Sequence, residues 1–143
     1  MPVKIATAVW SGDLMSGQGS ITGSSSGALK DLGVTWKTRT ESDELTSPEE
    51  LIAAANAACF AMALSHGLAE AGHPAANLDV TAKCTFSLTN GPKITTMELH
   101  VKGDVPGMDA AAFAAAAEGA GQNCPVSTAL KGNVEHTITS ELA

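Results

Sequence analysis

The sequence predicts an α+β fold, in which strands and helices occupy separate stretches of the chain. Three observations predict it. Short strand-like runs come first, an alanine-rich segment from Ser47 to Gly72 carries helix signals at both ends, and alternating runs return after it. This order lacks the regular strand–helix alternation of a parallel fold. We therefore expect an antiparallel sheet and a long, central, buried helix, within a single domain of residues 1–143.

The segment before the long helix is predicted to form strands and turns. The glycine- and serine-rich piece at residues 16–28 is typical of turns around a short strand. The run VTWKTRT, residues 34–40, alternates, with Val34 and Trp36 on one face and Arg39 on the other. We expect this run to be a half-buried strand, with Arg39 projecting from its more polar side.

The long helix is marked at both ends. Ser47 is a good N-cap, Pro48 suits the first helical position, and Glu50 completes a capping box with Ser47. Gly72 fits the position just after the helix, and Pro74 prevents its continuation. A helix of about 24 residues is roughly 36 Å long.

This helix carries no formal charge between Leu51 and Leu68. A membrane span is the alternative, but alanine dominates the segment, Ser65 and His66 interrupt it, and no basic flank supplies an orientation signal. A helix that is apolar on every side in a water-soluble chain is buried on every side. We expect a sheet to cover one face and a second subunit to cover the other.

Three strand-like runs and two helices follow. The helices begin at Asp109, an N-cap, and near Cys124, where Pro125 lies just inside the first turn. The first of them is expected to end between Gly119 and Gly121, and the second at Gly132. The strand-like runs span residues 79–88, 94–101 and 133–142.

The composition excludes several classes of protein. The chain has 143 residues and a net charge of −7, with Arg39 as its single arginine. An acidic chain without a basic cluster argues against binding nucleic acid or anionic membranes. The N-terminus lacks the apolar run of a secretory signal, so we expect a cytoplasmic protein. None of the three cysteines forms Cys-x-x-Cys or a zinc-site spacing, so no metal or cofactor is expected.

Cys59 lies midway along the long helix, among alanines. A cysteine in such a place is more often inert than reactive, because the helix dipole acts only over the first turn. A reactive thiolate there needs a cation from elsewhere. Arg39 precedes the helix, can hold a thiolate by charge-assisted hydrogen bonds, and cannot lose its own proton. The alternative for Arg39 is a solvated strand residue.

Glu49 is the candidate partner of Arg39, since Glu50 already has a role in the capping box. Ten helical residues separate Glu49 from Cys59, which is roughly 15 Å of rise. One Arg39 is therefore not expected to pair with Glu49 and touch Cys59 of the same subunit. A site completed by Arg39 and Glu49 of a second subunit resolves this difficulty.

Cys124 is better placed than Cys59 to ionise, because it lies at a helix N-terminus. Its alternative role is a modest N-cap. In a peroxide-reducing scheme, Cys59 becomes a sulfenic acid and Cys124 condenses with it to a disulfide. This scheme requires the two Cα atoms to approach within about 7 Å.

The other candidate side chains receive no catalytic role. Cys84 lies on the apolar face of an alternating run, where a buried thiol is ordinary packing. His66 is seven residues from Cys59, too far for direct contact. His136 fits a core histidine with satisfied hydrogen bonds.

The motifs SPEELIAAANAACFAMAL and NCPVSTAL resemble the osmotically inducible protein C / organic hydroperoxide resistance family. The likeness extends to AVWSGDLMSGQGSI, WKTRTE and VPGMD, and so covers nearly the whole chain. The Trp-x-Gly-Asp start and the position of Arg39 are closer to the osmotically inducible branch.

The resemblance implies a thiol-dependent peroxidase that forms an intertwined homodimer. Its active sites are expected at the subunit interface. Cys59 matches the peroxidatic cysteine, Cys124 the resolving cysteine, Arg39 the arginine that stabilises the thiolate, and Glu49 the acid that orients it. The implied substrates are organic hydroperoxides, and hydrogen peroxide less efficiently. A dithiol, in some members a lipoylated protein, reopens the disulfide.

Two other functions fit the residues. A non-catalytic dimeric module with an apolar interface groove matches the alanine-rich helices, and it predicts that Cys59 and Cys124 lie far apart. A general thiol–disulfide exchange protein lacks support because the chain has no Cys-x-x-Cys.

Overall fold

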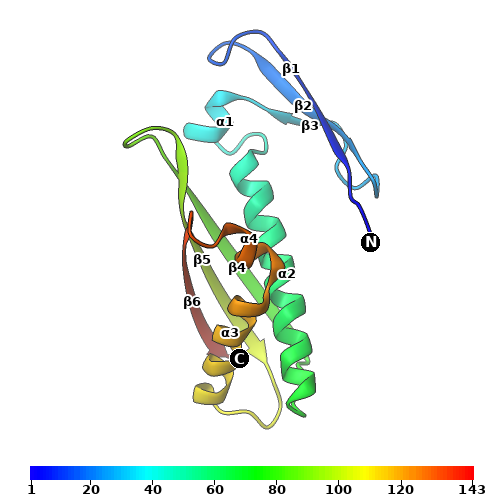
Figure 1. Cartoon of the computed structure of the whole chain (residues 1–143), viewed down its shortest axis with the longest axis vertical. Coiled ribbons are helices and arrows are strands. Elements are labelled where there is room, and N and C mark those ends of the chain that lie inside the picture. Colours follow the sequence, from blue (N-terminus) through cyan, green and yellow to red (C-terminus); the bar gives the residue numbers. More distant parts are fainter. The chain divides into compact units, whose positions relative to one another are not determined.

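The computed structural model describes all residues, 1–143. They form two compact units, Met1–Leu51 and Ile52–Ala143, each of which is described by itself. The mixture of two small sheets and helices confirms the α+β class (Figure 1). The elements in chain order are β1 (Ala6–Ser11), β2 (Gln18–Ser24), β3 (Leu32–Val34), α1 (Trp36–Thr40), α2 (Pro48–Glu70), β4 (Asn77–Ser87), β5 (Lys93–Asp104), α3 (Ala110–Asn123), α4 (Pro125–Leu130) and β6 (Glu135–Leu142).

The first unit holds a three-stranded antiparallel sheet in the order β1-β2-β3. The glycine-rich sequence permits close packing on this sheet. Gly19 on β2 lies under Trp10 of β1 and Val34 of β3, and a side chain at position 19 would collide with the Trp10 ring and the β1 backbone. A small residue is therefore required at this position.

The strand predicted for residues 34–40 is wrong, because most of it forms the short helix α1. Two threonines cap this helix reciprocally. Thr35 Oγ1 accepts a hydrogen bond from Thr38 N at 3.1 Å, and Thr38 Oγ1 accepts one from Thr35 N at 3.0 Å. These local bonds satisfy backbone groups that a strand would pair elsewhere, so the alternation of apolar side chains did not decide the structure.

Helix α2 agrees with its predicted ends. Ser47 Oγ accepts a hydrogen bond from Glu50 N at 3.1 Å, although the Glu50 carboxylate accepts from Thr46 Oγ1 and does not close the capping box. At the other end Gly72 adopts a φ of +82°, a left-handed conformation that favours glycine. His73 N donates back to Leu68 O at 2.9 Å, which satisfies one of the last carbonyls of the helix.

The sheet of the second unit has the order β4-β5-β6. Strands β4 and β5 pair antiparallel, as expected, but β6 pairs parallel to β5. The expected purely antiparallel sheet is therefore wrong in this respect. The chain between β5 and β6 forms α3 and α4, and a crossover of this length returns the chain to the same end of the sheet.

Side chains from α2, β5 and α3 form the core of the second unit. On α2 the buried residues recur at Phe60, Leu64 and Leu68, one face of a helix. The opposite face is exposed in the single chain, where the relative accessible surface of Met62 is 74%. The helix is thus buried on one side only. The other core members are Met97, Leu99, Val101, Val105, Phe113, Ala117, Ala120 and Cys124.

Helix α2 is long and apolar enough to cross a membrane by length and composition alone. The core helix of a globular protein meets the same criteria, and one such helix is weak support for a membrane span. Because Phe60, Leu64 and Leu68 of α2 pack into the core against β5 and α3, we assign α2 as a core helix.

Helix α3 extends to Asn123, two residues past the end predicted between Gly119 and Gly121. Its approach to the sheet uses two glycines. A side chain at Gly103 on β5 would collide with the Phe113 ring, and one at Gly121 would collide with Ile138 on β6. The extra turn of α3 therefore lies close to β6 and carries the chain to Cys124.

Candidate active site

Arg39 and Glu49 form an ion pair within the first unit. Arg39 Nε and Nη2 both donate to Glu49 Oε1, at 2.9 Å and 2.8 Å. The Glu49 side chain is only 8% exposed, whereas that of Arg39 is 32% exposed. The other carboxylate oxygen, Oε2, is buried and has no hydrogen-bond partner. A buried carboxylate of this kind holds the guanidinium in one orientation.

The pair forms because two neighbouring elements present it. Arg39 lies in the last turn of α1, and Glu49 lies in the first turn of α2, where a negative charge also favours the helix dipole. Only ten positions separate the two residues in the sequence. The role of this pair in catalysis stays a prediction.

Cys59 and Cys124 meet in the second unit, where their side chains lie close enough for each to shift the pKa of the other. Cys59 lies midway along α2 and is partly exposed, whereas Cys124 is fully buried. Cys124 joins two helices: its N–H donates to Ala120 O at 2.8 Å at the end of α3, and it is the N-cap residue of α4. Both thiols are free. This contact contradicts the distant cysteines that a non-catalytic module predicts.

The two thiols have opposite tendencies to ionise. Burial raises the pKa of Cys59, and the hydrogen bond to Cys124 raises it further. Burial also acts to raise the pKa of Cys124, but hydrogen bonds from Cys59, Ser127 and the Val126 backbone outweigh it and lower that pKa overall. Cys59 is therefore the proton donor of the pair. The lowered pKa that a reactive thiolate at Cys59 requires is therefore not found within a single subunit.

Cys84 is separate from this pair. It lies on β4, opposite Met97 of β5, and packs against the core. This placement agrees with a structural role.

A buried amide beside the thiols was missed by the sequence analysis. Asn56 is fully buried on α2, one turn before Cys59. Its Nδ2 donates to Ser127 Oγ at 2.9 Å and lies 3.7 Å from Cys124 Sγ, while its Oδ1 lies 3.1 Å from His136 Nε2. The available signal was a single amide in a run of alanines, because a buried amide requires hydrogen-bond partners. His136 was expected to be a satisfied core histidine.

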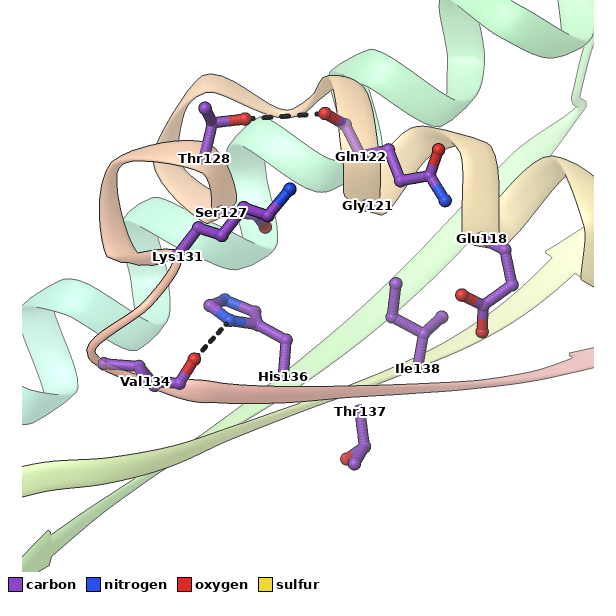
Figure 2. Close-up of a pocket in the computed structure, with 10 residues that line it drawn as sticks. All are labelled: Glu118, Gly121, Gln122, Ser127, Thr128, Lys131, Val134, His136, Thr137 and Ile138. Carbon is purple, nitrogen blue, oxygen red and sulfur yellow. Dashed lines mark hydrogen bonds between the residues drawn. The ribbon is translucent and has the colours of Figure 1, made fainter.

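His136 also lines a surface pocket of about 570 Å³. Figure 2 shows His136 and Ile138 projecting from β6 toward α3 and α4, with Thr137 on the opposite face of the strand. The remaining lining residues are Glu118, Gly121, Gln122, Ser127, Thr128, Lys131 and Val134. The hydrogen-bonded series from Cys124 to His136 therefore connects the thiol pair to this pocket. No group of three or more His, Cys, Asp or Glu side chains is arranged to hold a metal ion.

Comparison with known proteins gives concordant matches. The family profile described as OsmC-like protein matches residues 41–139. Peroxiredoxin OsmC of Escherichia coli strain K12 is 40% identical over 132 residues, which are 92% of each chain. An organic hydroperoxide resistance protein from Elizabethkingia anophelis has a TM-score of 0.75 at 28% identity, covering 97% of this chain and 96% of that one. A protein titled organic hydroperoxide resistance protein OsmC from Legionella pneumophila has a TM-score of 0.72 at 26% identity, covering 96% of both chains.

These matches cover most of the chain and include both cysteines. They confirm the resemblance that the sequence motifs predicted, including the closeness to the osmotically inducible branch. The chain belongs to the OsmC-like protein family.

Proposed function

We propose that this protein is a cysteine-based peroxidase that reduces organic hydroperoxides, and hydrogen peroxide less efficiently, through a disulfide between Cys59 and Cys124. The observation that carries the proposal is the contact between a partly exposed thiol and a fully buried one. A peroxide can reach the partly exposed Cys59 from solvent, whereas Cys124 is buried. The names of the relatives support the same reaction class.

The reaction has two steps on the protein. In the first, the Cys59 thiolate attacks the O–O bond of ROOH, a sulfenic acid forms on Cys59, and RO⁻ takes a proton to leave as ROH. In the second, the Cys124 thiolate attacks the Cys59 sulfur, an S–S bond forms, and the hydroxyl group leaves as water after protonation. A dithiol reductant, such as a lipoylated protein, then reopens the disulfide by thiol–disulfide exchange.

Cys59 needs a cation for the first step, because its pKa is raised within the single subunit. We propose that Arg39 supplies it and that Glu49 orients Arg39 for this purpose. The rise of α2 between residues 49 and 59 favours Arg39 from a second copy of the chain, as in an intertwined homodimer. The exposed apolar face of α2, which includes Ala54, Ala58 and Met62, supports this assembly.

The cytoplasm is the compartment that fits the proposal, because its reducing poise returns cysteines to thiols after each turnover. The proposed chemistry requires a dithiol as co-substrate and no bound prosthetic group or metal. The sulfur atoms of Cys59 and Cys124 carry the two electrons of each turnover.

Mass spectrometry after one equivalent of cumene hydroperoxide tests the reaction. We expect the loss of two hydrogen atoms and a linked pair of peptides that contain Cys59 and Cys124. Cys124→Ser should instead accumulate sulfenic acid at Cys59 and then over-oxidise. Cys84→Ser is the matched control and should behave as the wild type. An unchanged mass, or dithiothreitol-driven turnover that survives Cys59→Ser at the wild-type rate, would refute the proposal.

A further inference from the structure

Asn56 occupies a demanding position in α2. A fully buried carboxamide costs free energy unless its donors and acceptors are satisfied, and its neighbours on the helix are alanines. Both ends of the amide have partners from distant parts of the chain: Ser127 and Cys124 at the nitrogen, and His136 at the oxygen. These partners lie 68 to 80 positions away in the sequence. The arrangement fixes the direction in which the amide points.

His136 determines that direction. His136 lies between two acceptors, with its Nε2 atom 3.1 Å from Asn56 Oδ1 and its Nδ1 atom 3.3 Å from Val134 O. Because Asn56 Oδ1 can only accept a hydrogen bond, its pairing with His136 forms when the ring carries a proton on Nε2. The Nδ2 group of Asn56 is then aimed at Ser127 Oγ and at Cys124 Sγ. A reversed amide would place a partly negative oxygen against the sulfur, which disfavours a thiolate.

We propose that Asn56, oriented by His136, is a positioning residue that holds Cys124 as the thiolate which attacks oxidised Cys59. The inference rests on the proposed function and adds to it the group that prepares the resolving step. In that step the Cys124 sulfur bonds to the Cys59 sulfur, the S–O bond of the sulfenic acid breaks, and the departing hydroxide is protonated to water.

The resolving thiolate needs this support because Cys124 is fully buried, and burial disfavours its charged form. In the reduced protein the Cys59 thiol donates a hydrogen bond to it, but that thiol is consumed when the peroxide reacts. Asn56 Nδ2, the Ser127 hydroxyl and the backbone N–H groups of Val126 and Ser127 remain as donors to Cys124 during resolution.

The titratable groups around this network are few. Cys59 faces Cys124 from α2, and His136 approaches from β6. Glu118 of α3 and Lys131, just after α4, line the adjoining pocket. Glu118 and Lys131 are unchanged in every variant at position 136, and the two variants compared there, glutamine and phenylalanine, are both uncharged. A difference between these variants therefore reports on the hydrogen bond to Asn56.

The experiment compares His136→Gln with His136→Phe in single-turnover reactions with cumene hydroperoxide. Glutamine keeps an N–H donor for Asn56 Oδ1, and phenylalanine keeps bulk but has no donor. Dimedone trapping measures the lifetime of the Cys59 sulfenic acid, and mass spectrometry measures disulfide formation, each as a function of pH. Gln122→Ala changes the same pocket without touching the network and is the control.

We expect His136→Phe to slow disulfide formation roughly tenfold at neutral pH, which corresponds to about one pH unit in the thiolate fraction. Raising the pH should restore its rate, while His136→Gln and Gln122→Ala should follow the wild-type profile. Asn56→Asp, which keeps the size of Asn56 and replaces its N–H₂ with oxygen, should slow the step further. Asn56→Asp also tests the inference if His136→Phe is poorly folded.

Equal rates and equal pH profiles for His136→Phe, Asn56→Asp and the wild type would overturn the inference and leave the network a packing feature. If the wild type forms the disulfide normally in the same experiment, that result overturns only the inference about Asn56 and leaves the proposed function standing. A wild type that forms neither sulfenic acid nor disulfide would overturn the proposed function, and this inference with it.

Discussion

The ion pair of Arg39 and Glu49 and the thiol pair of Cys59 and Cys124 are built in different ways. The ion pair joins residues ten positions apart, from a short helix and the first turn of the next one. The thiol pair joins the middle of α2 to the α3–α4 junction, 65 positions later in the sequence. The first is an ion pair held by two hydrogen bonds to one carboxylate oxygen, whereas the second shares protons and depends on a buried network.

The difference shows what each pair lacks. A guanidinium cannot lose its proton, so the ion pair supplies constant charge but no nucleophile. The thiols supply two nucleophiles, but the exposed one has a raised pKa within its subunit. Peroxidase chemistry requires a nucleophilic sulfur beside a fixed cation. The proposed dimer unites the two pairs, and the following changes test each of them.

The largest effect should come from the ion pair. Arg39→Gln should reduce the rate of Cys59 oxidation by about 10²-fold, the usual cost of losing one charge-stabilising group. It should also destabilise the fold, because the buried Glu49 carboxylate then loses its partner. Activity assays and thermal unfolding measure the two effects separately.

The double variant Arg39→Gln with Glu49→Gln separates charge from folding. Removing the buried carboxylate should restore much of the lost stability, while activity should stay low because no guanidinium remains. If activity returned along with stability, Arg39 would be a structural residue, and its proposed part in the reaction would be wrong.

The sequence predicted the ion pair more completely than the thiol environment, for a physical reason. Glu49 was assigned to Arg39 from the capping rules of one helix, although the strand predicted around Arg39 is a helix held by Thr35 and Thr38. Cys59 and Cys124 were proposed as the reactive cysteines from their motifs. Their hydrogen-bond partners were not, because contacts of Asn56 with residues about 70 to 80 positions away depend on how β6 joins the sheet.

The next largest effect concerns the packing of α3, the helix that leads to Cys124, against β5. Gly103→Ala should cost about 1–3 kcal/mol of stability, because its methyl group would collide with the rigid Phe113 ring of α3. Gly119→Ala on the same helix meets no neighbour and should stabilise by roughly 0.5–1 kcal/mol. Chemical denaturation followed by circular dichroism measures both changes.

The same experiment tests whether the chain is one domain. Both tryptophans, Trp10 and Trp36, lie in the first unit, so fluorescence reports on that unit and circular dichroism on the whole chain. For one cooperative domain, Gly103→Ala should shift the two transitions equally. A shift seen by circular dichroism alone would show that the units unfold separately and would contradict the single-domain prediction.

The smallest effect concerns the shared protons of the thiol pair. In a Cys84→Ser background, Cys59→Ala should raise the pKa of Cys124 relative to Cys59→Ser. Burial of Cys124 persists in both variants, but only serine retains a donor in place of the Cys59 thiol, the strongest of the hydrogen bonds that lower this pKa. The ultraviolet absorbance of the thiolate as a function of pH measures the difference.

The same pair of variants also predicts how the stability of the fold changes with pH. A lowered folded-state pKa contributes stability above the ordinary thiol value of 9.0, and this contribution is lost as the pH falls through the folded-state pKa of Cys124. The serine variant should therefore gain stability over the alanine variant as the pH rises into this range. Equal titrations and a constant stability difference would mean that the Cys59 thiol does not donate a hydrogen bond to Cys124. The assignment of Cys59 as the proton donor of the pair would then be wrong.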